Sequence, residues 1–163
     1  YIKELYDAGV VSGTSATTFS PAANVTRAQF VTMLAGLAGA DVSNCPATPF
    51  RDVPEGAWYA PYVNWALANG IVSGTSAVTF SPDASITRQD MAVMLYSYTQ
   101  RFQVHLQQQP VKPFTDAGSI AAYAQIAVQT LQRAGVISGM PDGSFQPYGT
   151  ATREQACTML CML

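Results

Sequence analysis

Apolar residues recur along this chain at spacings of three and four, the pattern of a helix with one buried face. The pattern is strongest in three segments, each of which follows a Thr-Arg pair. Its positions there are Phe30, Leu34 and Leu37, then Met91, Leu95 and Tyr98, then Ala156, Leu160 and Leu163. A shorter run of the same kind precedes each segment, at Ile2, Leu5 and Tyr6, at Val63, Ala66 and Leu67, and at Val128 and Leu131. We expect two helices in each third of the chain, with these residues in the core.

The two predicted helices belong to a unit that occurs three times. The stretch "GVVSGTSATTFSPAANVTRAQF" at 9–30 returns at 70–91 as "GIVSGTSAVTFSPDASITRQDM" and at 135–156 as "GVISGMPDGSFQPYGTATREQA". Upstream, "FRDVPEGAWYAPYVNWALANG" is matched by "FTDAGSIAAYAQIAVQTLQRAG", whereas the first unit keeps only "YIKELYDAG". We therefore divide the chain into repeat 1 (1–39), whose opening is expected upstream of Tyr1, repeat 2 (50–100) and repeat 3 (114–163), with connectors at 40–49 and 101–113.

Each repeat is predicted to be a helix, an irregular loop and a second helix. Gly9, Gly70 and Gly135 follow the first helix and suit its C-terminal cap. A helical hairpin of this size is too small to fold alone, so the three are expected to bury their apolar faces against one another. The prediction is a single all-α domain, residues 1–163, with pseudo-threefold symmetry.

Composition narrows the functional classes. Hydrophobic residues make up 48% of the chain and charged residues 11%, which indicates a globular protein. The net charge of −2 argues against a nucleic-acid partner, so any bound anion must meet a focused site. No apolar run reaches the roughly 18 residues of a membrane span.

The three cysteines do not predict a disulfide framework or a zinc site. Cys157 and Cys161 are expected on one helix face, where a bridge between them would strain the helix. Pairing of Cys45 with one of them stays open, although three small buried apolar side chains are the favoured interpretation. Asp142 and Ser144 in "MPDGS" indicate a tight turn rather than a calcium loop.

The Thr-Arg pairs stand where the second helices are predicted to begin. Thr26 is followed after three residues by Gln29, Thr87 by Asp90 and Thr152 by Gln155, which approximates a capping box. Helix formation does not explain the arginines between them, because a positive charge in the first turn opposes the helix dipole.

Two interpretations of Arg27, Arg88 and Arg153 are open from the residues alone. In the structural one, each guanidinium reaches an acid or a backbone carbonyl of a neighbouring repeat, with Asp52 and Asp116 as natural partners. In the functional one, the guanidinium and the free N–H groups of the helix start together hold an anion, for which a carboxylate is well suited.

The repeat resembles the S-layer homology (SLH) motif. The resemblance rests on "FRDV…WYAPYVNWALANGIVSG…TFSPDASITRQDM" and on "FTDA" with "GMPDGSFQP…ATREQ", and it covers nearly the whole chain as three tandem motifs. It implies a three-pronged bundle that attaches exported proteins non-covalently to the bacterial cell wall. The implied ligand is a secondary cell-wall polysaccharide with pyruvylated sugars, held in grooves between prongs, with a peptidoglycan-associated glycan as a further candidate partner.

By position, the resemblance nominates six glycan-binding residues: Arg27, Arg88, Arg153, Asp52, Asp116 and Trp58. The chain departs from the family pattern at Gln29 and Gln155, where an acid is usual, and at Tyr123, which takes the place of Trp58. Repeat 1 lacks this stretch, so not every groove is expected to bind. Grooves using Arg88 and Trp58 are the first expectation.

Two other classes are weighed against this one. Glycosidic or nucleophilic catalysis needs paired carboxylates or a base beside a nucleophile, and the single histidine, His105, stands in a Gln-rich connector without such neighbours. No catalytic residue, cofactor or metal is expected, and His105 is interpreted as solvated. The alternative is a protein-interaction module in which the arginines only hold the repeats together and no glycan binds.

Overall fold

The computed structural model describes residues 1–163 as helices and loops that are linked by isolated β-bridges. The prediction of an all-α fold is confirmed. The helices are α1 (Ile2–Asp7), α2 (Arg27–Ala38), α3 (Ala60–Ala68), α4 (Arg88–Arg101), the 3₁₀ turns η1 (Ala117–Ser119) and η2 (Ala122–Ala124), α5 (Gln125–Arg133) and α6 (Arg153–Cys161). None of them is both long enough and apolar enough to cross a membrane.

The second helix of each repeat begins directly after its threonine, as predicted. The side-chain oxygens of Thr26, Thr87 and Thr152 each accept the backbone N–H of the third helical residue. A complete capping box forms at Thr26 and Thr152, but Asp90 does not bond back to Thr87. The aspartate is one methylene shorter than glutamine, and its carboxylate turns elsewhere.

The first helices end at the predicted glycines. Gly9, Gly70 and Gly135 have φ values of 74°, 69° and 74°. This left-handed conformation is costly for a residue with a β-carbon, so glycine stops each helix and turns the chain into the middle loop of the repeat.

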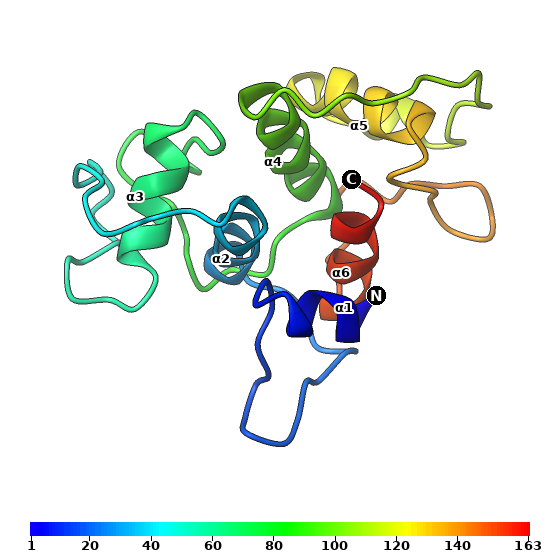
Figure 1. Ribbon diagram of the computed structural model, residues 1–163. Coiled ribbons are helices and arrows are strands. Elements are labelled where there is room, and N and C mark those ends of the chain that lie inside the picture. The colour runs from blue at the N-terminus through cyan, green and yellow to red at the C-terminus, as the bar shows by residue number, and fades with distance from the viewer.

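Helix pairing differs from the expected hairpins. The first helix of a repeat packs on the second helix of the preceding repeat: α3 on α2, α5 on α4 and, to close the circle, α1 on α6. The long middle loop separates the two helices of one repeat, whereas each connector brings consecutive repeats together. We call each packed pair a prong, and Figure 1 shows α3, α5 and α1 on the outside of α2, α4 and α6.

The predicted apolar stripes supply the core. Phe30, Leu34, Met91 and Leu95 are fully buried, and Ala156 and Leu160 are buried at the same places in α6. Leu37 and Leu163, at the ends of their stripes, are partly buried against this core. The prediction that Tyr6 lies in the core is wrong, because this residue is 59% exposed. The polar Gln132 holds the corresponding place in α5, which marks this position as an outer one.

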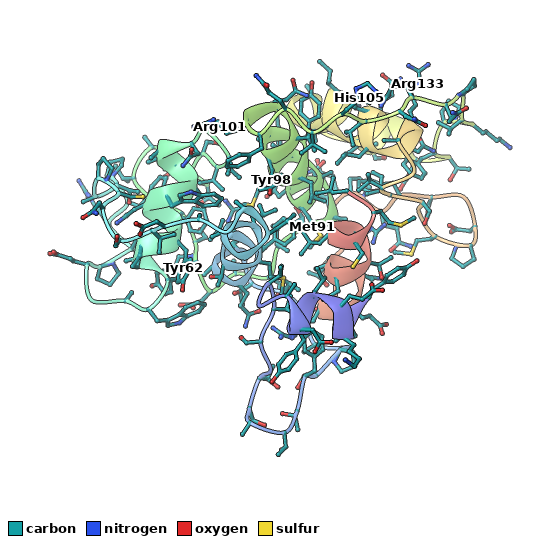
Figure 2. All side chains as sticks on the ribbon, in the orientation of Figure 1. Tyr62, Met91, Tyr98, Arg101, His105 and Arg133 are labelled. Carbon is teal, nitrogen blue, oxygen red and sulfur yellow. The ribbon has the colours of Figure 1, made fainter.

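The three repeats meet through a closed ring of backbone hydrogen bonds just before the second helices. Val25 donates to the carbonyl of Ala151 (3.0 Å), Ala151 to that of Ile86 (3.4 Å) and Ile86 to that of Val25 (2.8 Å). All three residues have no exposed surface. Met91, in the first turn of α4, lies near the middle of the molecule in Figure 2. The pseudo-threefold axis therefore passes through buried backbone.

Candidate functional site

Each Thr-Arg arginine bonds to the middle loop of another repeat. The Nε–H of Arg27 donates to the carbonyl of Phe80 (2.8 Å), that of Arg88 to Phe145 (2.7 Å) and that of Arg153 to Phe19 (2.9 Å). The guanidinium carbons lie 4.9, 5.1 and 4.4 Å from the ring centres of the same phenylalanines, within cation–π range. The arginines thus cross-link repeat 1 to 2, 2 to 3 and 3 back to 1, as the structural interpretation predicted.

These side chains are almost completely buried. Arg27, Arg88 and Arg153 are 6%, 4% and 5% exposed. Burial lowers the pKa of each guanidinium from its ordinary value. An arginine starts so far above neutrality that all three keep their charge.

The N–H groups at the helix starts are not free to hold an anion, contrary to the functional interpretation. Those of Arg27, Arg88 and Arg153 donate to the carbonyls of Ala84, Gly149 and Ala23 at 2.8–2.9 Å. The N–H groups of the next residues donate to proline carbonyls in the same loops. Loops of neighbouring repeats therefore satisfy the helix starts, and these N–H groups are not available to an anion.

The structural interpretation expected Asp52 and Asp116 to pair with the arginines, but neither aspartate forms an ion pair with one of them. The two oxygens of Asp52 accept the N–H groups of Phe80 and Ser81, each at 2.8 Å. Asp116 binds the N–H groups of Phe145 and Gln146 in the same way, at 2.8 Å each. The aspartate therefore fixes the phenylalanine from its N–H side, while the arginine of the preceding repeat fixes it from the carbonyl side.

Three grooves surround the buried arginines. The Arg153 groove, of about 310 Å³, is formed by the middle loop of repeat 1, α2 and the start of the α3 segment. Its lining consists of Val10, Val11, Ser12, Gly13, Thr14, Gln29, Thr32, Met33, Trp58 and Arg153. Trp58 is 59% exposed, and its ring packs at a right angle to that of Tyr59, so much of the Trp58 side chain is accessible in this groove.

The Arg27 groove is the counterpart one repeat further on and measures about 330 Å³. Tyr123 takes the place of Trp58, and Asp90 takes the place of Gln29. Its lining consists of Arg27, Ile71, Val72, Ser73, Gly74, Thr75, Asp90, Val93, Met94 and Tyr123.

The Arg88 groove is the smallest, at about 130 Å³, and its lining contains no aromatic residue. The position equivalent to Trp58 would precede Tyr1. Its lining consists of Arg88, Val136, Ile137, Ser138, Gly139, Met140, Gln155, Thr158 and Met159.

The grooves combine residues differently from the expectation that Arg88 and Trp58 act together. The structure places Trp58 with Arg153, because three repeats contribute to the Arg153 and Arg27 grooves: one the arginine, one the loop and second helix, and one the aromatic residue. Only two repeats line the Arg88 groove. The loop residues Ser12–Thr14 and the helix residue Met33 were not predicted as groove residues. The repeat alignment could have indicated their equivalence, but not which repeat supplies the arginine.

The local charge differs among the grooves. Arg27 is paired with Asp90, with Nη1 and Oδ2 3.1 Å apart, and it also lies within the field of Asp52. Arg88 experiences the field of Asp116 but forms no ion pair. No carboxylate lines the Arg153 groove, and none stabilises the charge of Arg153. The Arg153 groove is therefore the one with the least compensated positive charge.

The other candidate residues lie apart from the grooves. His105 is exposed in the connector, on the outer side of the molecule in Figure 2. Cys45, Cys157 and Cys161 are free thiols, and burial raises the pKa of Cys157 and Cys161. No group of histidine, cysteine and carboxylate side chains is arranged to hold a metal ion. Asp142 accepts bonds from the N–H and hydroxyl of Ser144, as a turn residue does.

Comparison with known proteins identifies related sequences. The S-layer homology domain family matches residues 1–31, 49–92 and 113–157. An endoglucanase of Bacillus sp. (strain KSM-635) is 39% identical over 166 residues, covering 100% of this chain and 17% of the endoglucanase. A cellulosome-anchoring protein of Acetivibrio thermocellus is 30% identical over 146 residues, which cover 87% of this chain and 32% of that protein. S-layer protein EA1 of Bacillus anthracis is 30% identical over 131 residues, covering 79% of this chain and 15% of EA1. The chain therefore spans only a minor part of the length of these relatives.

Proposed function

Because this chain belongs to the S-layer homology domain family, we propose that it attaches a longer exported bacterial protein to the cell wall without a covalent bond. The names of two relatives, a cellulosome-anchoring protein and an S-layer protein, support this role. The role puts the protein at the cell surface, in the wall or the S-layer. Enzyme-named relatives such as the endoglucanase contain the matched segment as a small share of their length, which fits a non-catalytic module.

We further propose that the ligand is a secondary cell-wall polysaccharide carrying pyruvylated sugars and that it binds in the Arg153 groove. The observation that carries this proposal is a guanidinium without a carboxylate partner in the same groove as an exposed indole. A pyruvyl ketal presents a carboxylate on a sugar ring. The carboxylate can accept charge-assisted hydrogen bonds from Arg153, and the sugar face can lie on Trp58.

Arg153 keeps hydrogen-bond donors for such a ligand. Its Nε–H and one Nη2–H donate to the carbonyls of Phe19 and Ser12, which leaves Nη1 without a protein acceptor. The two backbone bonds hold the guanidinium plane fixed, so little side-chain entropy is lost on binding. A groove of about 310 Å³ is at the lower end of the range of small-ligand sites, roughly 300–1,000 Å³.

The Arg88 groove is the second proposed subsite. Neither Nη atom of Arg88 has a protein acceptor, and no carboxylate lines this groove. We propose that a sugar carboxylate binds Arg88 there as it binds Arg153.

The test is calorimetric titration with a pyruvylated cell-wall disaccharide and with the same sugar lacking the ketal. An arginine substitution would remove a cross-link between repeats, so Trp58→Ala is the more informative variant. Tyr6→Ala is its matched control, because Tyr6 is an equally exposed aromatic residue outside the grooves. We expect Trp58→Ala to weaken binding at least fivefold, about 1 kcal/mol, and Tyr6→Ala to leave it unchanged.

Removal of the ketal should weaken binding more than Trp58→Ala does, because it removes the charge that Arg153 recognises. Equal affinity for the two sugars would contradict recognition of pyruvate. No binding to either sugar would favour the alternative, in which the arginines only hold the repeats together and the surface recognises a protein.

A further inference from the structure

The third residue of the second helix distinguishes the Arg27 groove from the other two. Gln29 and Gln155 accept the backbone N–H of their own capping threonines, each at 3.0 Å. These glutamine side chains are therefore tied to their own helices and do not bond to an arginine. Asp90 makes no such bond to Thr87.

The carboxylate of Asp90 faces the groove instead. Oδ2 accepts from Nη1 of Arg27 at 3.1 Å, and Oδ1 accepts from the hydroxyl of Tyr123 at 2.6 Å. Both oxygens thus have donors from two other repeats. The Arg27 side chain is 7% exposed and that of Asp90 is 26% exposed, so this ion pair is largely shielded from water and from salt screening.

A ligand carboxylate would meet two obstacles in this groove. It would have to displace an intramolecular carboxylate that is already in place on Arg27. It would also come close to the negative charge of Asp90, in a groove with no second cation. Neither obstacle exists in the Arg153 or Arg88 groove.

We propose that Asp90 acts as an internal carboxylate that excludes anionic ligands from the Arg27 groove, so that this chain binds acidic sugars in two grooves and not in three. This inference rests on the proposed function for the site, and it makes Asp90 a specificity-determining residue. The choice between glutamine and aspartate at this one position decides whether the arginine is available: glutamine completes the capping box, whereas aspartate neutralises the guanidinium of the neighbouring repeat.

The test exchanges the two residue types in both directions. In Asp90→Gln, the glutamine can complete the capping box at Thr87, as Gln29 does at Thr26, and Arg27 loses its partner. In Gln29→Asp, a carboxylate is placed in the Arg153 groove. Asp90→Asn is a second variant of similar size, and melting curves confirm that each protein is folded.

The first readout follows the arginine Nε–H signals by NMR while pyruvate is added as the probe. In the wild type we expect Arg153 and Arg88 to shift and Arg27 to stay unchanged, with Arg51 and Arg133, both exposed, as references for non-specific effects. In Asp90→Gln and Asp90→Asn, Arg27 should also respond. A response of Arg27 in the wild type equal to that of Arg153 would overturn the proposal.

The second readout is the stoichiometry of the pyruvylated disaccharide. Asp90→Gln should add one binding site, and Gln29→Asp should weaken binding at the Arg153 groove at least tenfold. If the wild type binds and Asp90→Gln gains no site, the inference fails while the proposed function stands. If no arginine of the wild type responds to pyruvate or the sugar, the proposed function fails. In that case the Nε–H signal of Arg27 in Asp90→Gln tests the inference by itself. A shift of this signal supports the inference, and an unchanged signal overturns it.

Discussion

The backbone N–H and the backbone carbonyl of Phe80 and of Phe145 are both hydrogen-bonded to side chains. An aspartate of the same repeat accepts the N–H, and an arginine of the preceding repeat donates to the carbonyl while stacking on the ring. The next residues, Ser81 and Gln146, have φ values of 58° and 59°, which are uncommon for residues with a β-carbon. The hydrogen bonds on both sides compensate for this backbone strain.

Replacement of Arg88 by lysine should destabilise the protein although the charge is kept. A lysine has no Nε–H fixed in a plane, so the bond to the Phe145 carbonyl and the stacking on its ring are both lost. We expect the free energy of unfolding to fall by about 2–4 kcal/mol in urea titrations. The control is Arg133→Lys at an exposed position, and an equal effect there would contradict the explanation.

The carboxylate of Asp116 is predicted to be as important as the arginine. In Asp116→Asn, the amide NH₂ would replace one of two acceptors and face a backbone N–H. The loss should be about 1.5–3 kcal/mol of unfolding free energy, measured in urea. Asp83→Asn removes an exposed carboxylate without a hydrogen bond and should change stability little.

Tyr123 predicts a dependence of stability on alkaline pH. Burial, followed by the hydrogen bond to Asp90 and its charge, raises the pKa of Tyr123 from 10 to about 12. The stabilisation from the neutral hydroxyl is therefore complete below pH 10 and is lost as the pH rises to 12. The stability advantage of the wild type over Tyr123→Phe should decline over this range in urea titrations. A Tyr123 phenolate that forms at pH 10, followed by ¹³C NMR of the ring, would contradict the assignment.

At the scale of the helix, the sequence predicted which helices form and where they begin and end better than it predicted which helices pack together. The Thr-x-x-Gln caps and the glycines mark where helices begin and end, because capping is local chemistry. An apolar stripe such as that of Phe30 and Leu34 reports burial but does not identify its partner. The cross-repeat pairing of α2 with α3 depends on the path of the middle loops, which no periodicity in the sequence encodes.

The same limit applies to the grooves. The sequence nominated Arg153 of repeat 3 and Trp58 of repeat 2 as binding residues but did not place them in the same groove. Only the fold brings residues from three repeats together there. Asp52 and Asp116 were nominated beside the arginines and lie beside them, but they bond to the backbone. Residue type therefore identified the positions, while the contacts that define their roles came from tertiary structure.

Helix α5 offers a test of the pairing at the scale of one element. Leu131 is fully buried where α5 packs on α4, whereas Ile126 on the same helix is 66% exposed. Leu131→Ala should lower the free energy of unfolding by about 2–5 kcal/mol. Ile126→Ala is the matched control and should change it by about 0.5 kcal/mol or less. Equal losses in thermal or urea unfolding would contradict the arrangement of this prong.

At the scale of the whole molecule, the repeats form a circle rather than a row. Three relations repeat around it: the helix pairs, the arginine cross-links and the backbone bonds among Val25, Ile86 and Ala151. The third member of each set joins the last repeat to the first. A row of repeats keeps two exposed terminal faces, whereas here the final helix α6 is covered by the first helix α1 (Figure 1).

In a closed circle of this kind, each repeat contacts two others and none is terminal. The Cys161 thiol lies 3.7 Å from the carbonyl of Tyr1, so the end of α6 and the start of α1 lie side by side. We therefore expect that no repeat unfolds separately from the other two and that the domain unfolds in a single cooperative step.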